Sequence, residues 1–136
     1  MPAQTRLIID ASVLIAHIMG SEATSAVATQ LFDGFLASGR NVGVMSALTV
    51  SEAMVNPSRL GRARDVGLGV LDMPGLTVRP VDFLIGAEAA RIRAALPLAL
   101  PDAVVIATGV LTTCQILVTN DRRLGAAIAG VVPEMQ

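Results

Sequence analysis

Four acidic residues stand where a carboxylate could do chemistry. Asp10 follows the apolar run Leu7–Ile9, Asp102 opens a long apolar segment, and Asp121 comes soon after the run "ILV". Glu52 lies among apolar neighbours in "ALTVSEAMV". Carboxylates gathered at one place repel one another unless a cation joins them, and Mg²⁺ or Mn²⁺ suits a site made of oxygen ligands. Such a site can activate water and stabilise the leaving oxygen of a phosphodiester.

Each acid also has a structural explanation. The three aspartates stand at starts of predicted helices, where aspartate is a favoured cap and complements the helix dipole. Capping cannot explain Glu52, which shares a helix face with Leu48 and Val55. A carboxylate there is costly to bury without a partner, unless the face lies at the core edge and the side chain reaches solvent. Both interpretations remain open at this point.

The hydrophobic pattern predicts the elements that must position these acids. Strands are expected at about 6–10, 41–45, 76–80 and 115–119, with a further short one near 131–132. The segments between them predict helices: Ser12–Met19; from a cap at Ser21 to about Ser38, with Gly39 as the stop; from Ser46 to a break before Pro57; Ser58–Met73; Asp82–Leu96; from Pro101 to Thr112 or Thr113; and a short one from Asp121. This alternation predicts an α/β fold with a parallel sheet covered on both faces, and functional groups at the carboxyl ends of its strands.

The composition indicates one globular domain spanning residues 1–136. Hydrophobic residues make up 53% of the 136 residues and charged residues 15%, and the net charge of −1 gives no overall attraction to nucleic acid. No apolar stretch reaches the ~18 residues of a membrane span, and the first residues lack a secretory signal pattern. A single cysteine, Cys114, fits a reducing compartment. We therefore expect a cytoplasmic protein without a membrane segment.

Missing residue types exclude much chemistry. The chain has no lysine, one histidine and one cysteine, which excludes a Walker-type loop, a Schiff base and the usual zinc sites. A Ser-His-Asp site would need His17, and no Gly-x-Ser-x-Gly turn supplies the serine. All ten basic residues are arginines, several of them clustered: Arg59, Arg62 and Arg64; Arg91 and Arg93; Arg122 and Arg123. They are interpreted either as solvated surface charge or as a local track for phosphates.

Four segments together resemble a known family. "IIDASVLIA", "SALTVSEAM", "LPDAVVIATG" and "LVTNDRRL" resemble the four-acid pattern of the PIN-domain ribonucleases. In length and layout the chain is similar to VapC, the toxin subunit of VapBC toxin–antitoxin pairs, and the likeness extends from Leu7 to Leu124. It implies a three-layer α/β/α sandwich with a central, mainly parallel sheet. It also implies a Mg²⁺- or Mn²⁺-dependent endoribonuclease, the toxin of a type II toxin–antitoxin system in the prokaryotic cytoplasm.

The resemblance assigns roles to individual residues. The positions matching the family's metal-binding and catalytic acids are Asp10, Glu52, Asp102 and Asp121. Ser12 and Thr119 match hydroxyl positions that would orient carboxylates or waters beside the first and last acids. Arg122 and Arg123 are expected to contact RNA, because an aromatic content of 2% leaves little for base stacking. The sequence departs from the family where Arg123 and Leu124 replace a frequent further acid and aromatic, which leaves Asp121 as the acid of that segment.

The resemblance also implies partners, and other functions compete with it. Expected partners are the RNA substrate, a second copy forming a homodimer, and a small antitoxin that presents an arginine to the acidic pocket. The high apolar fraction independently suggests an interface, with segments 21–38 and 46–73 as candidates. One alternative is a catalytically inactive PIN-like RNA-binding or assembly module, which the four intact acids disfavour. An unrelated α/β phosphatase is disfavoured by the missing lysine and the absence of Asp-x-Asp after the first strand.

Overall fold

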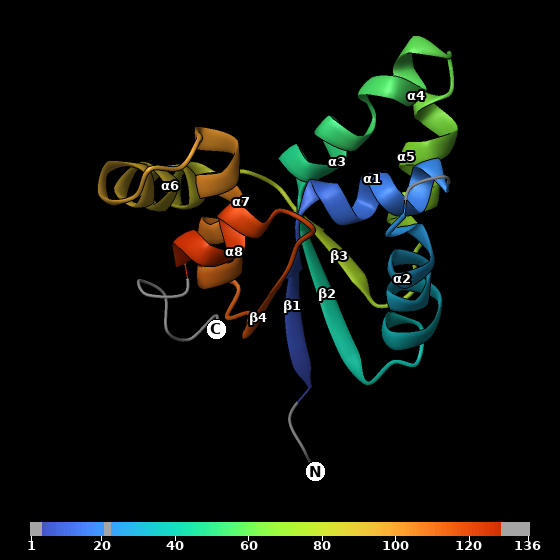
Figure 1. The fold of residues 1–136 in the computed structure, drawn as a ribbon, viewed down its shortest axis with the longest axis horizontal. Coiled ribbons are helices and arrows are strands. Elements are labelled where there is room, and N and C mark those ends of the chain that lie inside the picture. Colours follow the sequence, from blue (N-terminus) through green and yellow to red (C-terminus); the bar gives the residue numbers. More distant parts are fainter. Residues whose placement is uncertain (1–3, 21–22, 129–136) are drawn as a thin grey trace.

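The described part of the chain is built around four parallel strands. The computed structural model describes residues 4–20 and 23–128. The strands are β1 (Thr5–Ile9), β2 (Asn41–Ser46), β3 (Leu76–Arg79) and β4 (Ile116–Val118), in the spatial order β3-β2-β1-β4. All three pairings are parallel (Figure 1). The predicted parallel sheet is therefore confirmed.

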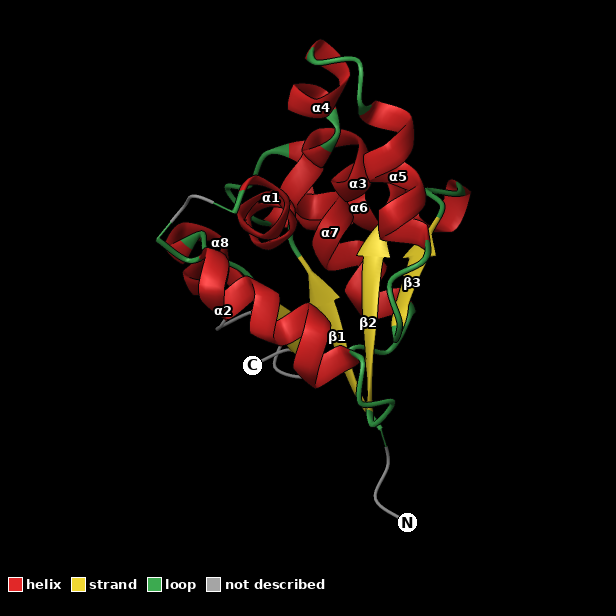
Figure 2. Ribbon diagram, turned by 90° about the vertical axis from the view of Figure 1, so that its right-hand side faces the viewer, coloured by secondary structure: helices red, strands yellow, loops and turns green. Residues whose placement is uncertain are grey.

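Helices cover both faces of this sheet. Along the chain they are α1 (Ala11–Met19), α2 (Ser25–Gln30), a π-helical turn η1 (Leu31–Leu36), α3 (Ala47–Ala53), α4 (Val55–Arg59), α5 (Ala63–Leu71), α6 (Phe83–Ala95), α7 (Leu100–Leu111) and α8 (Arg122–Ile128). Figure 1 shows α6, α7 and α8 on one side of the sheet, and Figure 2 looks onto the layer that contains α1, α2 and α5. The three-layer α/β/α sandwich is confirmed.

Alternation along the central strands divides the core into two clusters. Ile8 packs with buried residues of α6 and α7, whereas Leu7 and Ile9 pack with α1, α2 and η1 on the opposite face. Val44 and Met45 divide between the same two clusters in β2. A strand buried on both faces explains why the sequence shows continuous apolar runs there rather than an alternation with polar residues.

The strand order has a topological switch point at β1. The chain adds β2 and β3 on one side of β1 and then crosses over to add β4 on the other side. In parallel sheets, such a change of direction leaves an opening at the carboxyl ends of the two strands concerned. Asp10 directly follows β1, and Asp121 lies in the loop that follows β4. The topology therefore places both residues beside the same opening.

Three of the predicted helices differ in their boundaries from the structure. The break expected before Pro57 falls at Met54 instead, and Pro57 lies in the first turn of α4, where its missing N–H removes no helical hydrogen bond. The single helix expected from Ser58 to Met73 is divided into α4 and α5 by Gly61, whose φ of +70° ends the first piece. The helix expected from a cap at Ser21 begins instead at Ser25, with Thr24 at its N-cap position, and continues as the π-helical turn η1. Ser21 itself and the strand near 131–132 lie outside the described residues. Within the described residues, no helix has both the length and the apolar character needed to cross a lipid bilayer.

Candidate functional site

Asp10 is oriented by two hydroxyl groups. The residue is only 7% exposed and occupies the N-cap position of α1, yet its side chain makes no capping hydrogen bond. Instead, its Oδ2 accepts hydrogen bonds from Ser12 Oγ and Thr119 Oγ1, both at 2.8 Å. The capping explanation is therefore wrong for Asp10. No described residue donates to its other oxygen, Oδ1, which leaves that atom available to a ligand.

The same hydroxyls tie the loop after β4 to the start of α1. Thr119 Oγ1 accepts a hydrogen bond from the backbone N–H of Asp121 at 2.9 Å, and Ser12 Oγ accepts one from the N–H of Asn120 at 3.0 Å. Asp10 donates its own N–H to the carbonyl of Val118 at 3.0 Å. Each hydroxyl thus serves as donor to the carboxylate and acceptor from the backbone, which fixes its direction. This network holds Asp10 in one orientation.

Asp121 does act as a helix cap. Its Oδ1 accepts hydrogen bonds from the backbone N–H groups of Arg123 at 2.9 Å and Leu124 at 3.3 Å, which satisfies donors in the first turn of α8. The structural explanation is therefore right for this acid, although it occupies only one carboxylate oxygen. Capping fixes the side chain at the carboxyl edge of the sheet and is compatible with a second role for Oδ2.

Glu52 extends from α3 beside the end of β2. Ser46 begins this helix, and its Oγ accepts a hydrogen bond from Leu48 N–H at 3.1 Å. The Glu52 residue is exposed, yet partial burial of its carboxyl group raises its pKa, and the charges of Asp10 and Asp102 raise that pKa further. Its side chain therefore reaches solvent, but lies close enough to Asp10 and Asp102 for their charges to repel its own.

Asp102 lies in the first turn of α7, directly after Pro101. The residue is half-buried, and this burial raises its pKa. The charges of Asp10 and Asp121 raise the pKa further, whereas Arg123 lowers it in part. Asp10 therefore acts on Glu52 and on Asp102 alike. The four predicted acids share one electrostatic environment at the carboxyl edge of the sheet.

This environment fits a divalent cation in its donor chemistry. The ion pairs formed by the described residues are Arg79–Asp82 and Arg91–Glu88, and neither involves any of the four acids. As the side chains stand, no three described acidic, histidine or cysteine side chains are close enough together to enclose an ion. The carboxylates of Glu52 and Asp102 accept no hydrogen bond from described residues, so both are free to turn. All the available donors are oxygens, as Mg²⁺ and Mn²⁺ prefer.

Two arginines directly follow Asp121 in the sequence and lie beside the acidic site. Arg122 and Arg123 are exposed residues in the first turn of α8. Cations at a helix N-terminus oppose the helix dipole, so their position does not serve the stability of α8. The effect of Arg123 on the pKa of Asp102 shows that its charge acts on the acidic site. Contact with RNA remains a prediction for both residues.

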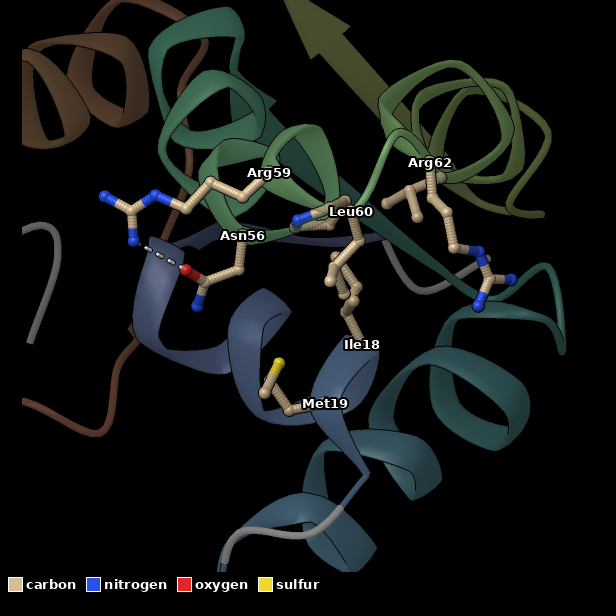
Figure 3. A pocket seen from close by; sticks show the side chains of 8 residues that line it. Ile18, Met19, Asn56, Arg59, Leu60 and Arg62 are labelled. Atoms are coloured by element: carbon tan, nitrogen blue, oxygen red, sulfur yellow. Dashed lines mark hydrogen bonds between the residues drawn. The ribbon is translucent and has the colours of Figure 1, made fainter.

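A separate groove, which the sequence did not reveal, lies between the C-terminal end of α1 and the helices α4 and α5. Figure 3 shows Ile18, Met19 and Leu60 pointing into it, with Arg59 and Arg62 at its sides. Its volume is about 450 Å³, and the Leu60 residue is 75% exposed. The sequence indicated interfaces within segments 21–38 and 46–73 but could not show that α1 contributes one wall.

The match to a family covers nearly the whole described chain. Residues 7–129 match the profile of the family described as PIN domain. The chain belongs to the PIN domain family. The matched segment contains the four acids together with Ser12 and Thr119, as the sequence resemblance implied. No curated protein is similar enough in sequence to count as a relative.

Solved structures share this PIN fold. A toxin–antitoxin complex from Klebsiella pneumoniae matches with a TM-score of 0.72 and 20% identity, over 97% of this chain and 96% of that one. The Mycobacterium tuberculosis toxin VapC20, which cleaves the sarcin-ricin loop, matches with a TM-score of 0.72 and 16% identity, over 90% and 94%. VapBC2 from Rickettsia felis, bound to a DNA fragment from its promoter, matches with a TM-score of 0.67 and 12% identity, over 96% of each chain. At these identities the likeness shows the fold.

Proposed function

We propose that this PIN domain is a metal-dependent endoribonuclease, the toxin of a type II toxin–antitoxin pair in the prokaryotic cytoplasm. The observation that carries the proposal is the mutual electrostatic effect of four acids at the carboxyl edge of the sheet, none of which forms an ion pair with an arginine in the described part of the chain. Two of the similar structures support it, because one is a toxin–antitoxin complex and another is a toxin that cleaves the sarcin-ricin loop. Cys114 is buried and free, which suits a reducing compartment.

Each of the four acids would bind the ion in a way that depends on how its carboxylate is held. Mg²⁺ or Mn²⁺ would be held by Asp10 through its free Oδ1, by Glu52 and Asp102, and by Asp121 directly or through water. Once bound, such an ion supplies an activated water and stabilises charge on a phosphodiester. Ser12 and Thr119 keep the Asp10 carboxylate aimed at the site.

The substrate would be held mainly through its phosphates. Arg122 and Arg123 stand beside the acids and are exposed, so they can pair with the RNA backbone. Arginine binds phosphate oxygens in pairs, which gives orientation as well as affinity. The absence of tryptophan and tyrosine leaves little base stacking to select a sequence.

Cleavage of RNA by the purified chain tests the proposal. We expect cleavage with Mg²⁺ or Mn²⁺ that chelation abolishes and that Asp10→Asn lowers by more than the about 10- to 100-fold typical of changes around a metal ligand. Asp33→Asn is the matched control, since Asp33 is an exposed acid of η1 without a hydrogen bond or ion pair to described residues. Equal cleavage by the wild-type chain and Asp10→Asn would refute the assignment.

A second function is a catalytically inactive PIN-like module that binds RNA or assembles with partners. The arrangement of the acids favours it in one respect, because no three of the described side chains enclose an ion as they stand. The same preparation separates the two functions. RNA binding that persists without cleavage at any divalent-ion concentration would support the module.

The groove offers a surface for the antitoxin. Its apolar floor with Arg59 and Arg62 at the sides fits a segment in which apolar side chains are flanked by carboxylates. The guanidinium group of Arg62 forms no hydrogen bond or ion pair with described residues, and that of Arg59 donates only to the side-chain oxygen of Asn56, at 3.3 Å. We propose that a small protein encoded by the neighbouring gene binds here and inhibits the nuclease, while a second copy of the chain forms a homodimer.

Binding experiments test these partners separately. Leu60→Glu should weaken the antitoxin complex, whereas Leu71→Glu, at a similarly exposed leucine that does not line the groove, should not. Equal weakening by both substitutions would place the antitoxin elsewhere. Light scattering of the chain alone tests the homodimer, which a monomer at every concentration would exclude.

A further inference from the structure

Thr49 carries a buried hydroxyl group without a partner. The residue is 1% exposed, and its Oγ1 is the only buried side-chain nitrogen or oxygen of the described residues that lacks a hydrogen bond. Leaving such a group unpaired is costly, and native proteins rarely do so without a reason. This hydroxyl therefore needs an explanation.

The usual solution for a helical threonine is not open to Thr49. In α7, Thr108 Oγ1 donates to the carbonyl of Val104 at 2.7 Å, and Thr112 Oγ1 donates to that of Thr108 at 2.6 Å. The corresponding carbonyl for Thr49 belongs to Met45, which lies in β2 rather than in the helix. The first turn of α3 thus leaves this hydroxyl without a backbone acceptor.

The packing of α3 shows which way Thr49 faces. Leu48 packs against the cluster on the α6–α7 side of the sheet, and Val50 belongs to the cluster on the opposite side. Successive helical residues are about 100° apart, so Thr49 points between these two neighbours. α3 contacts both α1 and α7. Thr49 therefore faces the carboxyl edge of the sheet, where Figure 1 shows the starts of α1 and α3 together.

Glu52 is the acid placed to use this hydroxyl. It follows Thr49 by three residues, which puts both on one face of the helix. Long helical side chains lean toward the N-terminus and cover the preceding turn, so the path of the Glu52 side chain lies over Thr49. The Asp10 carboxylate already has two hydroxyl donors, whereas the Glu52 carboxylate has no hydrogen-bond partner among the described residues.

We infer that Thr49 is a positioning residue that donates its hydroxyl hydrogen bond to the Glu52 carboxylate when that side chain turns inward to bind the divalent ion. The inference rests on the proposed function. It assigns to Thr49 the part that Ser12 and Thr119 play for Asp10: a fixed donor that holds a ligand in one orientation. In the absence of the ion the donor is unpaired, because Glu52 extends toward solvent.

Divalent-ion affinity, measured by calorimetry with Mn²⁺ alone, tests the inference. We expect Thr49→Val to weaken Mn²⁺ binding about 10-fold, since it removes the donor but keeps the shape of the side chain. Thr49→Ser should restore most of the affinity. The melting temperature of the metal-free protein should not fall in Thr49→Val, because no hydrogen bond is lost there. Thr108→Val is the matched control: it should lower the melting temperature and leave the affinity for Mn²⁺ unchanged.

A double-mutant cycle separates positioning from a merely structural role. In a Glu52→Ala background the donor has no acceptor, so adding Thr49→Val should cause no further loss of Mn²⁺ affinity. Wild-type affinity in Thr49→Val, or the same 10-fold loss in the Glu52→Ala background, would overturn the inference and leave the nuclease proposal intact. A wild-type chain that bound no Mn²⁺ would overturn the proposed function and this inference with it.

Discussion

The two halves of the acidic site are held in different ways. At the strand ends, Asp10 and Asp121 have carboxylate oxygens fixed by hydrogen bonds from hydroxyl and backbone donors. On the helices, Glu52 and Asp102 have no such bonds among the described residues, and their pKa values are raised by burial and by neighbouring acids. The carboxylates of Asp10 and Asp121 are held in place before a ligand binds, whereas those of Glu52 and Asp102 are not. Ion binding should therefore consist mainly of the helical carboxylates turning toward a fixed Asp10.

After Asp10→Asn, the largest effect is expected from Thr119→Val, which removes a hydroxyl that holds Asp10 and Asp121 in place. Thr119 Oγ1 donates to Asp10 and accepts from the backbone of Asp121, so its removal frees both. We expect divalent-ion affinity and cleavage to fall about 10- to 100-fold. Thr77→Val is the control, because Thr77 is exposed on the edge strand β3 and forms no side-chain hydrogen bond to described residues. Ion affinity is measured by calorimetry and activity by RNA cleavage. An equal loss of both in Thr119→Val and Thr77→Val would contradict the view that hydrogen bonds to Asp10 organise the site.

A smaller effect is expected from Glu52→Gln, which should raise the stability of the protein and lower its function. The substitution removes repulsion with Asp10 and Asp102, so the metal-free protein should melt at a higher temperature while ion affinity and cleavage fall. Glu88→Gln makes a useful contrast, since a hydrogen bond from Arg91 lowers the pKa of Glu88. That surface variant should melt at the same or a slightly lower temperature and cleave normally. A lower melting temperature for Glu52→Gln would show that its charge is not repelled.

The smallest expected effect is a pH dependence of the metal-free stability. Because the pKa values of Glu52 and Asp102 are raised in the folded protein, the folded state binds more protons than the unfolded state between the ordinary and the raised values. The free energy of unfolding should therefore fall as pH rises from about 4, the ordinary range for carboxyl groups, through the raised values. Mn²⁺ should stabilise the protein more at neutral pH than in acid, because ligand carboxylates must be deprotonated. Thermal melts across this range, with and without Mn²⁺, measure both trends, and a metal-free stability that rose with pH over this interval would contradict them.

The sequence by itself determined most of the elements and singled out the four candidate acids. Each of the four strands in the described residues was predicted within one or two residues of its observed bounds. The central strand β1 was the clearest, because a strand buried on both faces appears as a short continuous apolar run. Glu52 stood out because it lies inside a helix, where no cap explains a carboxylate. The order of the acids along the chain was enough to suggest the PIN family, since their spacing follows from the alternation of strands and helices. These features are local, and local sequence encodes them.

Only the tertiary structure decided how those residues are used. Asp10 and Asp121 both begin helices, yet one binds two hydroxyls from distant segments and the other caps its own helix. The unpaired hydroxyl of Thr49 depends on burial between two layers of the core, and the groove beside Leu60 requires α1 to pack near α4. The strand order that brings β4 beside β1 creates the hydrogen bonds of Asp10 and Ser12 with Thr119 and Asn120. Hydrogen bonds between residues as far apart in the sequence as Asp10 and Thr119 depend on that order, and a hydrophobic pattern along the chain does not contain it.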